Sequence, residues 1–147
     1  MSWLSNLEEY AKSYRDSFST NGFVEKNKIN GPGMGAFIEY QNSKMMFRLI
    51  NDRSQFEIRI FYDNSSDIDL APILAFIEIE KEGQSIQVLS FEEKIKYWEI
   101  NYDYKDPLKY LFESIEKIYE QLSDEISLEE KMKSYYTKRG DWLFPKK

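Results

Sequence analysis

Two runs of alternating side chains decide the fold of this chain: AFIEYQNSKMMFRLI at residues 36–50 and QFEIRIFY at residues 55–62. In the first run, the residues on each side of Asn42-Ser43 sort into two alternating faces, and the dipeptide itself is typical of a tight turn. In the second run, Phe, Ile or Tyr occupies every second position, so these side chains share one face of a strand. The two runs predict three strands of an antiparallel meander.

A helix is predicted before the meander, over residues 3–18. Apolar side chains recur there at three- and four-residue steps, which is the period of one helix face. Ser2 or Ser5 can cap its start, and Gly22 is typical of the left-handed turn that ends a helix. Residues 25–35 are predicted to be a loop that ends in a glycine-rich stretch.

Further strands are predicted after the meander. Residues 73–80 are expected to form a fourth strand and residues 85–91 a fifth, with a turn between them at Gly83. Residues 94–102 are ambiguous, because alternation favours a sixth strand while other apolar residues lie at helical spacing. We take the strand as the expectation.

Two helices are predicted toward the C-terminus. Asp106 is expected to cap the first, with Pro107 at its first position, and an apolar stripe carries this helix to residue 122. Ser127 and Glu130 have the spacing of a capping box, which predicts a second helix that ends near residue 138 before a glycine.

The predicted fold is therefore α+β, with an antiparallel sheet of about five to six strands flanked by an N-terminal helix and two C-terminal helices. The 147 residues match the usual size of one domain, and residues 1–147 are expected to form a single α+β domain. Hydrophobic residues make up 41% of the chain and aromatic residues 16%, a supply that favours a packed core over disorder.

The chain has neither cysteine nor histidine, and these absences narrow the chemistry. Disulfides, thiolate catalysis and every nucleophile paired with histidine are excluded, so we expect a protein that is not an enzyme. No stretch approaches the roughly 20 apolar residues of a membrane span. The N-terminal residues lack the pattern of a signal peptide, so the expected location is the cytoplasm.

The net charge of −6 is unevenly distributed along the sequence. Residues 1–62 carry +1, residues 63–130 carry −12 and residues 131–147 carry +5. A strongly anionic segment repels nucleic acid and attracts a basic protein partner. Acidic side chains also serve solubility alone, and the basic end of the chain can fold back on them.

Two motifs suggest ligands but lack the required context. The glycine-rich stretch at residues 31–35 precedes a strand rather than a helix, and Pro32 removes an amide donor, so it does not match a phosphate-binding loop. Asp63, Asp67 and Asp69 lie close together but lack the glycine and glutamate of a calcium loop. No cofactor and no metal are expected.

Acidic and tyrosine side chains in the second half of the chain are the candidate site. If residues 73–80 form a strand, Glu78 and Glu80 share one face of it, beside further acids. This face is open to three interpretations: a solvent face, a docking surface for a basic partner, or a carboxylate acid/base pair. As a docking surface, the predicted partner-binding residues are Glu78, Glu80, Glu99, Tyr102, Asp103 and Tyr104.

The chain resembles the immunity proteins encoded beside bacterial polymorphic toxins. The resemblance lies in its size, its acidity and its one-domain α+β layout, and its nearest sequence features are the acidic residues 63–130 and the run WEINYDY at residues 98–104. It implies direct, non-catalytic inhibition of a basic toxin such as a nuclease. The alternatives are a small carboxylate-based enzyme or ligand-binding domain, and a phage-type acidic mimic of DNA.

Overall fold

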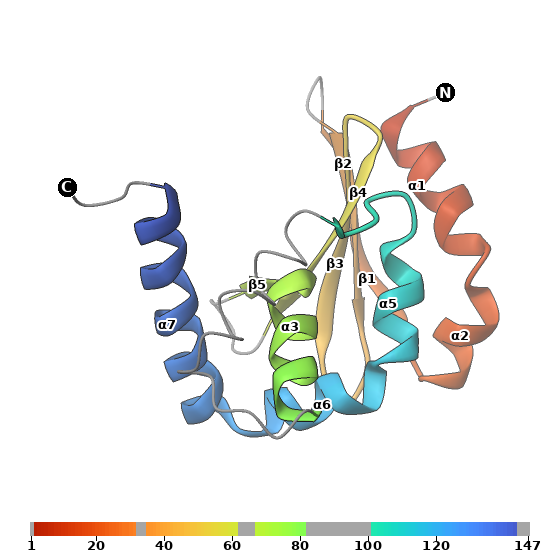
Figure 1. Ribbon diagram of the computed structural model, residues 1–147. Helices are drawn as coiled ribbons and strands as arrows, with labels where there is room; N and C mark the ends of the chain where they lie inside the picture. The colour runs from red at the N-terminus through yellow and green to blue at the C-terminus, as the bar shows by residue number, and fades with distance from the viewer. Residues whose placement is uncertain (1, 32–34, 62–66, 82–100, 144–147) are drawn as a thin grey trace. The chain divides into compact units, whose positions relative to one another are not determined.

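The computed structural model of the chain describes residues 2–31, 35–61, 67–81 and 101–143 (Figure 1). It is a mixed α+β structure, with a five-stranded antiparallel sheet and helices from both ends of the chain. The chain divides into two compact units. The first unit comprises Met1–Leu70 and Asp103–Ile115, and the second comprises Ala71–Tyr102 and Glu116–Lys147.

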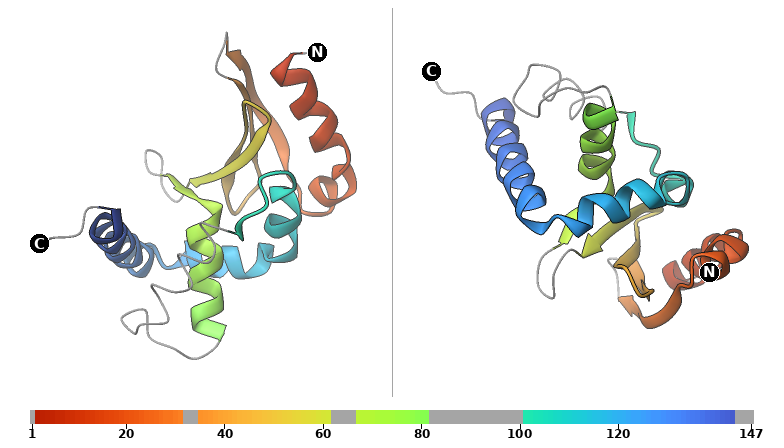
Figure 2. Two further views of the ribbon diagram at one scale, coloured as in Figure 1. Left: turned by 45° about the horizontal axis from the view of Figure 1, so that its top comes forward. Right: turned by 90° about the horizontal axis from the view of Figure 1, so that it is seen from below.

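The sheet lies in the first unit, and its strands follow one another in chain order. They are β1 (Val24–Gly31), β2 (Gly35–Gln41), β3 (Met46–Asp52), β4 (Gln55–Phe61) and β5 (Asp67–Asp69). Every neighbouring pair is antiparallel. Figure 2 shows the twisted ribbon that results.

The predicted meander is confirmed as β2, β3 and β4. Tyr40, Phe47 and Ile60 lie opposite one another across the three strands, so one face of the sheet collects apolar side chains as the alternation indicates. The turn between β2 and β3 forms at Asn42, whose side-chain oxygen accepts hydrogen bonds from the backbone N–H groups of Lys44 and Met45, both at 2.9 Å. This Asx-type bonding is why asparagine suits the turn.

The turn between β3 and β4 uses an unusual backbone. Arg53 and Ser54 both have positive φ, at 54° and 75°, as a two-residue hairpin loop of this hand requires. The buried Asn51 holds the loop, because its Oδ1 accepts a hydrogen bond from the Ser54 N–H at 2.9 Å. Its Nδ2 donates to the Trp3 carbonyl at 3.0 Å and so ties the loop to the first helix.

Residues 25–31 are a strand, and the prediction of a loop there is wrong. Seven of the eight residues of β1 are exposed, and β1 is an edge strand that pairs with β2 alone. Such a strand needs no apolar alternation, so the sequence gives no period to detect. Gly35 opens β2 with a φ of 122°, and a side chain there would collide with the Asn51 carbonyl oxygen on β3.

The predicted N-terminal helix is two helices, α1 (Trp3–Lys12) and α2 (Arg15–Thr20). Ser2 caps α1 as expected, accepting a hydrogen bond from the Ser5 N–H at 3.0 Å. Gly22 follows α2 with a φ of 71°, which confirms the predicted left-handed turn.

Three helices of the first unit cover one face of the sheet: α1, α2 and α5 (Pro107–Glu113) (Figure 1). Aromatic rings fill the space between them and the strands. Phe18 of α2 lies 4.4 Å from Tyr40 and 5.2 Å from Phe112 of α5, measured between ring centroids. Tyr10 of α1 stacks on Phe56 of β4 at 4.4 Å. These contacts form the core of the first unit.

Asp106 precedes α5 with Pro107 at the first helical position, as predicted. Its side chain accepts no hydrogen bond from the first turn of the helix and acts instead through two tyrosines. Its Oδ1 accepts hydrogen bonds from the hydroxyls of Tyr10 and Tyr14, at 2.8 and 2.7 Å. The Tyr10 hydroxyl in turn accepts from the Leu108 N–H at 2.9 Å and so satisfies a free donor of the first turn. Burial and this carboxylate raise the pKa of both tyrosines.

Residues 73–80 are helical, which contradicts the predicted fourth strand. They belong to α3 (Leu70–Lys81), whose first two turns are almost completely buried. Residues 70–77 are all apolar, and such a run does not distinguish a buried strand from a buried helix. Pro72 lies in the first turn, where a backbone N–H has no helical partner, so it costs this helix nothing.

The C-terminal helices begin and end at other residues than predicted. The stripe over 107–122 is divided at Ser114 into α5 and α6 (Ile115–Ser123). The last helix, α7 (Glu125–Leu143), starts before Ser127 and continues past Gly140, so neither residue marks an end. The predicted strand over residues 85–91, and residues 94–100 of the predicted sixth strand, lie outside the described residues.

Candidate functional site

Three of the predicted partner-binding residues are the acids Glu78, Glu80 and Glu99. Glu78 and Glu80 lie in α3, and the Glu78 side chain is half-buried. Because residues two apart on a helix do not face the same way, the strand face proposed for them does not exist. The side chain of Glu80 and all of Glu99 lie outside the described residues.

The other three, Tyr102, Asp103 and Tyr104, are consecutive but differ in their surroundings. Tyr102 is only 7% exposed and belongs to the core of the second unit, where it presents little area to a partner. Asp103 is exposed, and its side chain accepts a hydrogen bond from the Lys105 N–H at 2.9 Å. Tyr104 is half-buried in the first unit, and its carbonyl accepts from the Phe56 N–H at 2.8 Å.

Asp67 and Asp69, weighed above as cation ligands, bind an arginine instead. Arg59 of β4 donates to Asp67 from Nε at 2.8 Å and from Nη2 at 3.1 Å, and to Asp69 from Nη1 at 2.9 Å. These hydrogen bonds lower the pKa of Asp67. Within the part of the chain that the structure describes, no group of three acids is placed to hold a metal.

Arg48 occupies the same face of the sheet as Arg59 but has a different environment. Its guanidinium carbon lies 4.2 Å above the ring of Phe37 and 5.4 Å from that of Phe61, and its Nη2 lies 3.6 Å from Glu39. Its Nε is buried and has no hydrogen-bond acceptor among the described residues. The contact is a cation–π arrangement that holds the arginine flat on the sheet.

A row of exposed carboxylates follows α6 in the second unit. Glu116 and Glu120 are four residues apart on α6, so they lie on one side of this helix about 6 Å apart along its axis, and Asp124 is the exposed residue between α6 and α7. We call these three residues the acidic row. Glu120 has a weak ion pair, 3.5 Å from Lys117, in which both side chains are about two-thirds exposed. The spacing of Glu116 and Glu120 could have been recognised in the sequence, because the apolar stripe predicts a helix over these residues.

Exposed polar and aromatic groups continue onto α7. Glu129 and Glu130 are exposed near its start, and Tyr136 is 53% exposed, a large value for an aromatic side chain. The ring of Tyr136 lies 5.1 Å from that of Tyr135, which is buried. The second unit thus presents acids on consecutive helices together with an exposed tyrosine, a residue type that is enriched at interfaces.

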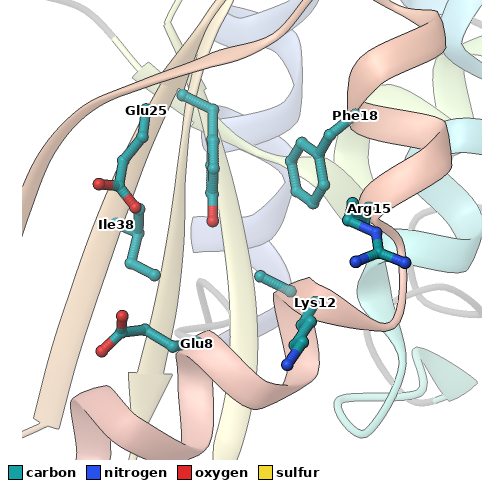
Figure 3. A pocket seen from close by; sticks show the side chains of 8 residues that line it. Glu8, Lys12, Arg15, Phe18, Glu25 and Ile38 are labelled. Carbon is teal, nitrogen blue, oxygen red and sulfur yellow. The ribbon is translucent and has the colours of Figure 1, made fainter.

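A pocket of about 360 Å³ lies in the first unit, between the helices α1 and α2 and the strands β1 and β2 (Figure 3). Its floor is apolar, and its rim carries charges of both signs. Glu8 and Glu25 lie on one side, and Lys12 and Arg15 on the other (Figure 3). The lining residues are Glu8, Ala11, Lys12, Arg15, Phe18, Glu25, Ile38 and Tyr40.

The two acids of the pocket share one cation. Lys28 of β1 lies 3.4 Å from the Glu8 carboxylate and 3.6 Å from that of Glu25. Tyr40 of β2 pairs with Glu25 of β1, and its pKa is raised first by burial and then by the negative charges of Glu25 and Glu8. The phenol therefore stays protonated at neutral pH and can act as a hydrogen-bond donor.

A β-bulge gives the pocket its acidic side. The register between β1 and β2 shifts between Glu25 and Asn27, leaving Lys26 as the extra residue. Three residues apart on a regular strand, Glu25 and Lys28 would point to opposite faces. With the bulge they pair with Tyr40 and Ile38 on the helix-covered face. The expectation of a loop over residues 25–35 gives no sign of this pocket, because the pocket depends on the strand register of β1.

Comparison with protein-family models, with characterised proteins and with solved structures found no match to this chain. None of the helices in the described part of the chain combines the length and the low polarity needed to cross a membrane. The arrangement of the side chains is therefore what supports a function.

Proposed function

We propose that this chain is a non-enzymatic binding protein that neutralises a basic protein toxin, in the manner of the immunity proteins that it resembles. The observation that carries the proposal is the acidic row: two exposed carboxylates on one side of α6 and a third directly after its last residue. The absence of histidine and cysteine from the sequence favours binding over catalysis.

The acidic row suits a partner with clustered lysine and arginine side chains. Carboxylates gathered along a helix and at its end form a negative potential that accelerates encounter with a basic surface. Exposed rim charges act mostly on the rate of association and on specificity, whereas affinity depends on buried anchors. Tyr136 of α7, with its large exposed area, is the proposed anchor.

The residues selected from the sequence remain proposed contacts, with Asp103 the most accessible of those described. The structure gives Tyr102 a core position, so we place it in support of the interface rather than in it. The acidic row extends the proposal to residues 116–124, which lie in the same anionic segment of the sequence.

The test uses the product of the gene that neighbours this one, provided that its C-terminal domain is basic and toxic. Co-expression of this chain is expected to restore growth, and the purified pair is expected to form a stoichiometric complex. Triple charge reversal, E116K, E120K and D124K, is expected to slow association about 10-fold or more at low salt.

A matched control changes the same charge elsewhere. E9K, D16K and E113K reverse three exposed acids of the first unit and are expected to leave association within about twofold of the unmodified chain. Equal losses in the two triple variants would mean that only net charge matters and would remove the acidic row from the interface. Failure of the unmodified chain to bind would reject the toxin as partner.

A further inference from the structure

We propose that the pocket between α1–α2 and β1–β2 binds a small zwitterion with an apolar body, of the class of α-amino acids with an apolar or aromatic side chain (Figure 3). The proposal concerns the first unit alone and does not depend on the toxin-binding function. It rests on three properties of the pocket: an unbalanced acidic side, a basic side without ion-pair partners among the described residues, and an apolar floor.

The acidic side has room for an ammonium group. Glu8 and Glu25 carry two negative charges, and Lys28 supplies one positive charge within 4 Å of both. The three side chains are each a little under half exposed, so their pairing is weak and can rearrange. A ligand ammonium beside them would balance the second carboxylate.

The basic side has room for a carboxylate. Lys12 ends α1 and Arg15 begins α2, so the break between the helices brings the two cations to the same rim. Neither has an ion pair or a side-chain hydrogen bond to any residue in the described part of the chain. Arginine is suited to this role because its guanidinium binds a carboxylate through two parallel hydrogen bonds.

The floor has the properties needed for an apolar body. Ala11, Phe18 and Ile38 line it, and all three are buried. Tyr40 adds one hydroxyl, which has no hydrogen-bond partner among the described residues and stays protonated for the reason given above. A volume of about 360 Å³ falls at the small end of ligand pockets.

The backbone around the pocket is irregular in two places, and both irregularities contribute to it. The bulge at Lys26 turns Glu25 toward the helices. The break at Ser13 and Tyr14 separates α1 from α2 and places Arg15 at the rim. Bulges are frequent where a strand must aim a side chain at a site.

The first experiment is isothermal titration of the full chain with L-phenylalanine at pH 7. A ligand of this size is expected to bind with a dissociation constant on the order of 1 mM. N-acetyl-phenylalanine lacks the ammonium group and phenylalanine amide lacks the carboxylate. Each is expected to bind at least 5-fold more weakly. Equal binding of all three compounds, or no saturation by L-phenylalanine at 20 mM (about 20 times the expected constant), would overturn the proposal.

The second experiment assigns the binding to the pocket. R15Q and E25Q change exposed side chains on its two sides, so both variants are expected to fold, which their melting temperatures check. R15Q is expected to weaken the binding of L-phenylalanine at least 5-fold and to leave the binding of phenylalanine amide, which lacks the carboxylate, unchanged. E25Q is also expected to weaken the binding of L-phenylalanine, but to leave the binding of N-acetyl-phenylalanine, which lacks the ammonium group, unchanged. R53Q and E9Q, exposed residues that do not line the pocket, are the matched controls. If R15Q and E25Q lose no more affinity for L-phenylalanine than R53Q and E9Q do, the ligand binds outside this pocket.

Discussion

The two faces of the sheet come from the same strands and turns, but they are held together by different forces. On the face covered by α1, α2 and α5, the side chains at the centre are at most 2% exposed and entirely apolar. They are Ile38, Phe47, Leu49, Ile58 and Ile60. One residue along each strand, the other face carries half-buried charges, including Arg48, Glu57 and Arg59. We call these the covered face and the polar face.

The difference between the two faces shows how much of the structure the alternation of side chains specifies. It assigns each side chain to a face, and burial of the apolar set then supplies most of the stability. The polar face must instead balance each partly buried charge against a partner. Arg59 donates hydrogen bonds to two carboxylates, and Arg48 lies against an aromatic ring. Glu57, in contrast, is partly buried near other acids. Substitutions on the two faces should therefore differ in size and in their response to pH.

The largest effect is expected for F47A on the covered face. Phe47 is fully buried and contacts the rings of Phe18, Phe23 and Tyr40. Its truncation leaves a cavity, so the free energy of unfolding is expected to fall by about 3–5 kcal/mol, measured by urea denaturation.

The matched control for F47A is F61A on the polar face. Phe61 is half-buried and contacts Arg48 at 5.4 Å, so its loss is expected to cost about 1 kcal/mol. Similar losses for F47A and F61A would show that the polar face is as well packed as the covered one. The two faces would then not differ in how they contribute to stability.

The sequence predicted the meander because three conditions coincided there. In each strand every second residue is apolar, and the turn contains Asn42. Because only one face of the meander is buried, the alternation can be recognised in the sequence. Neither neighbour met these conditions. Almost all residues of β1 are exposed, so its sequence shows no alternation of apolar residues. The start of α3 is buried on all sides, so no polar residues mark an exposed helix face. Pro72 was the available signal for a helix start in α3.

The candidate site was less predictable than the sheet. Charge counts identified an anionic segment, but the choice of Glu78 and Glu80 depended on a strand that is a helix. The pairing of Glu116 and Glu120 on one side follows from their spacing once residues 115–123 are taken as a helix, and Asp124 comes directly after it. The pocket does not follow from spacing, because its acidic side needs a bulge that no residue type in β1 signals.

A smaller effect is expected for R59Q on the polar face. Loss of the hydrogen bonds to Asp67, whose side chain is 30% exposed, is expected to cost about 1–2 kcal/mol at pH 7. Because Arg59 lowers the pKa of Asp67 in the fold, this stabilisation is complete above the ordinary aspartate value of about 4 and is lost as the pH falls through the lower, folded-state value. The unmodified chain and R59Q should therefore converge in urea titrations on going from pH 7 to pH 3. A difference that stays constant with pH would show that Arg59 stabilises by packing rather than by charge.

The smallest effect, and one of opposite sign, is expected for E57Q. Burial raises the pKa of Glu57, and Asp69 and Asp52 add to this, while Arg59 opposes it. A carboxyl group with a raised pKa stabilises the fold below its unfolded value of about 4.3, and that contribution is lost as the pH rises through the folded-state value. At pH 7 the ionised Glu57 thus carries a cost that glutamine avoids. Since the group is partly solvated, we expect E57Q to be more stable by only a few tenths of a kcal/mol at pH 7, with the gain vanishing near pH 4. A loss of stability at pH 7 would mean that Arg59 holds Glu57 as it holds Asp67, so that the polar face contains no unbalanced charge.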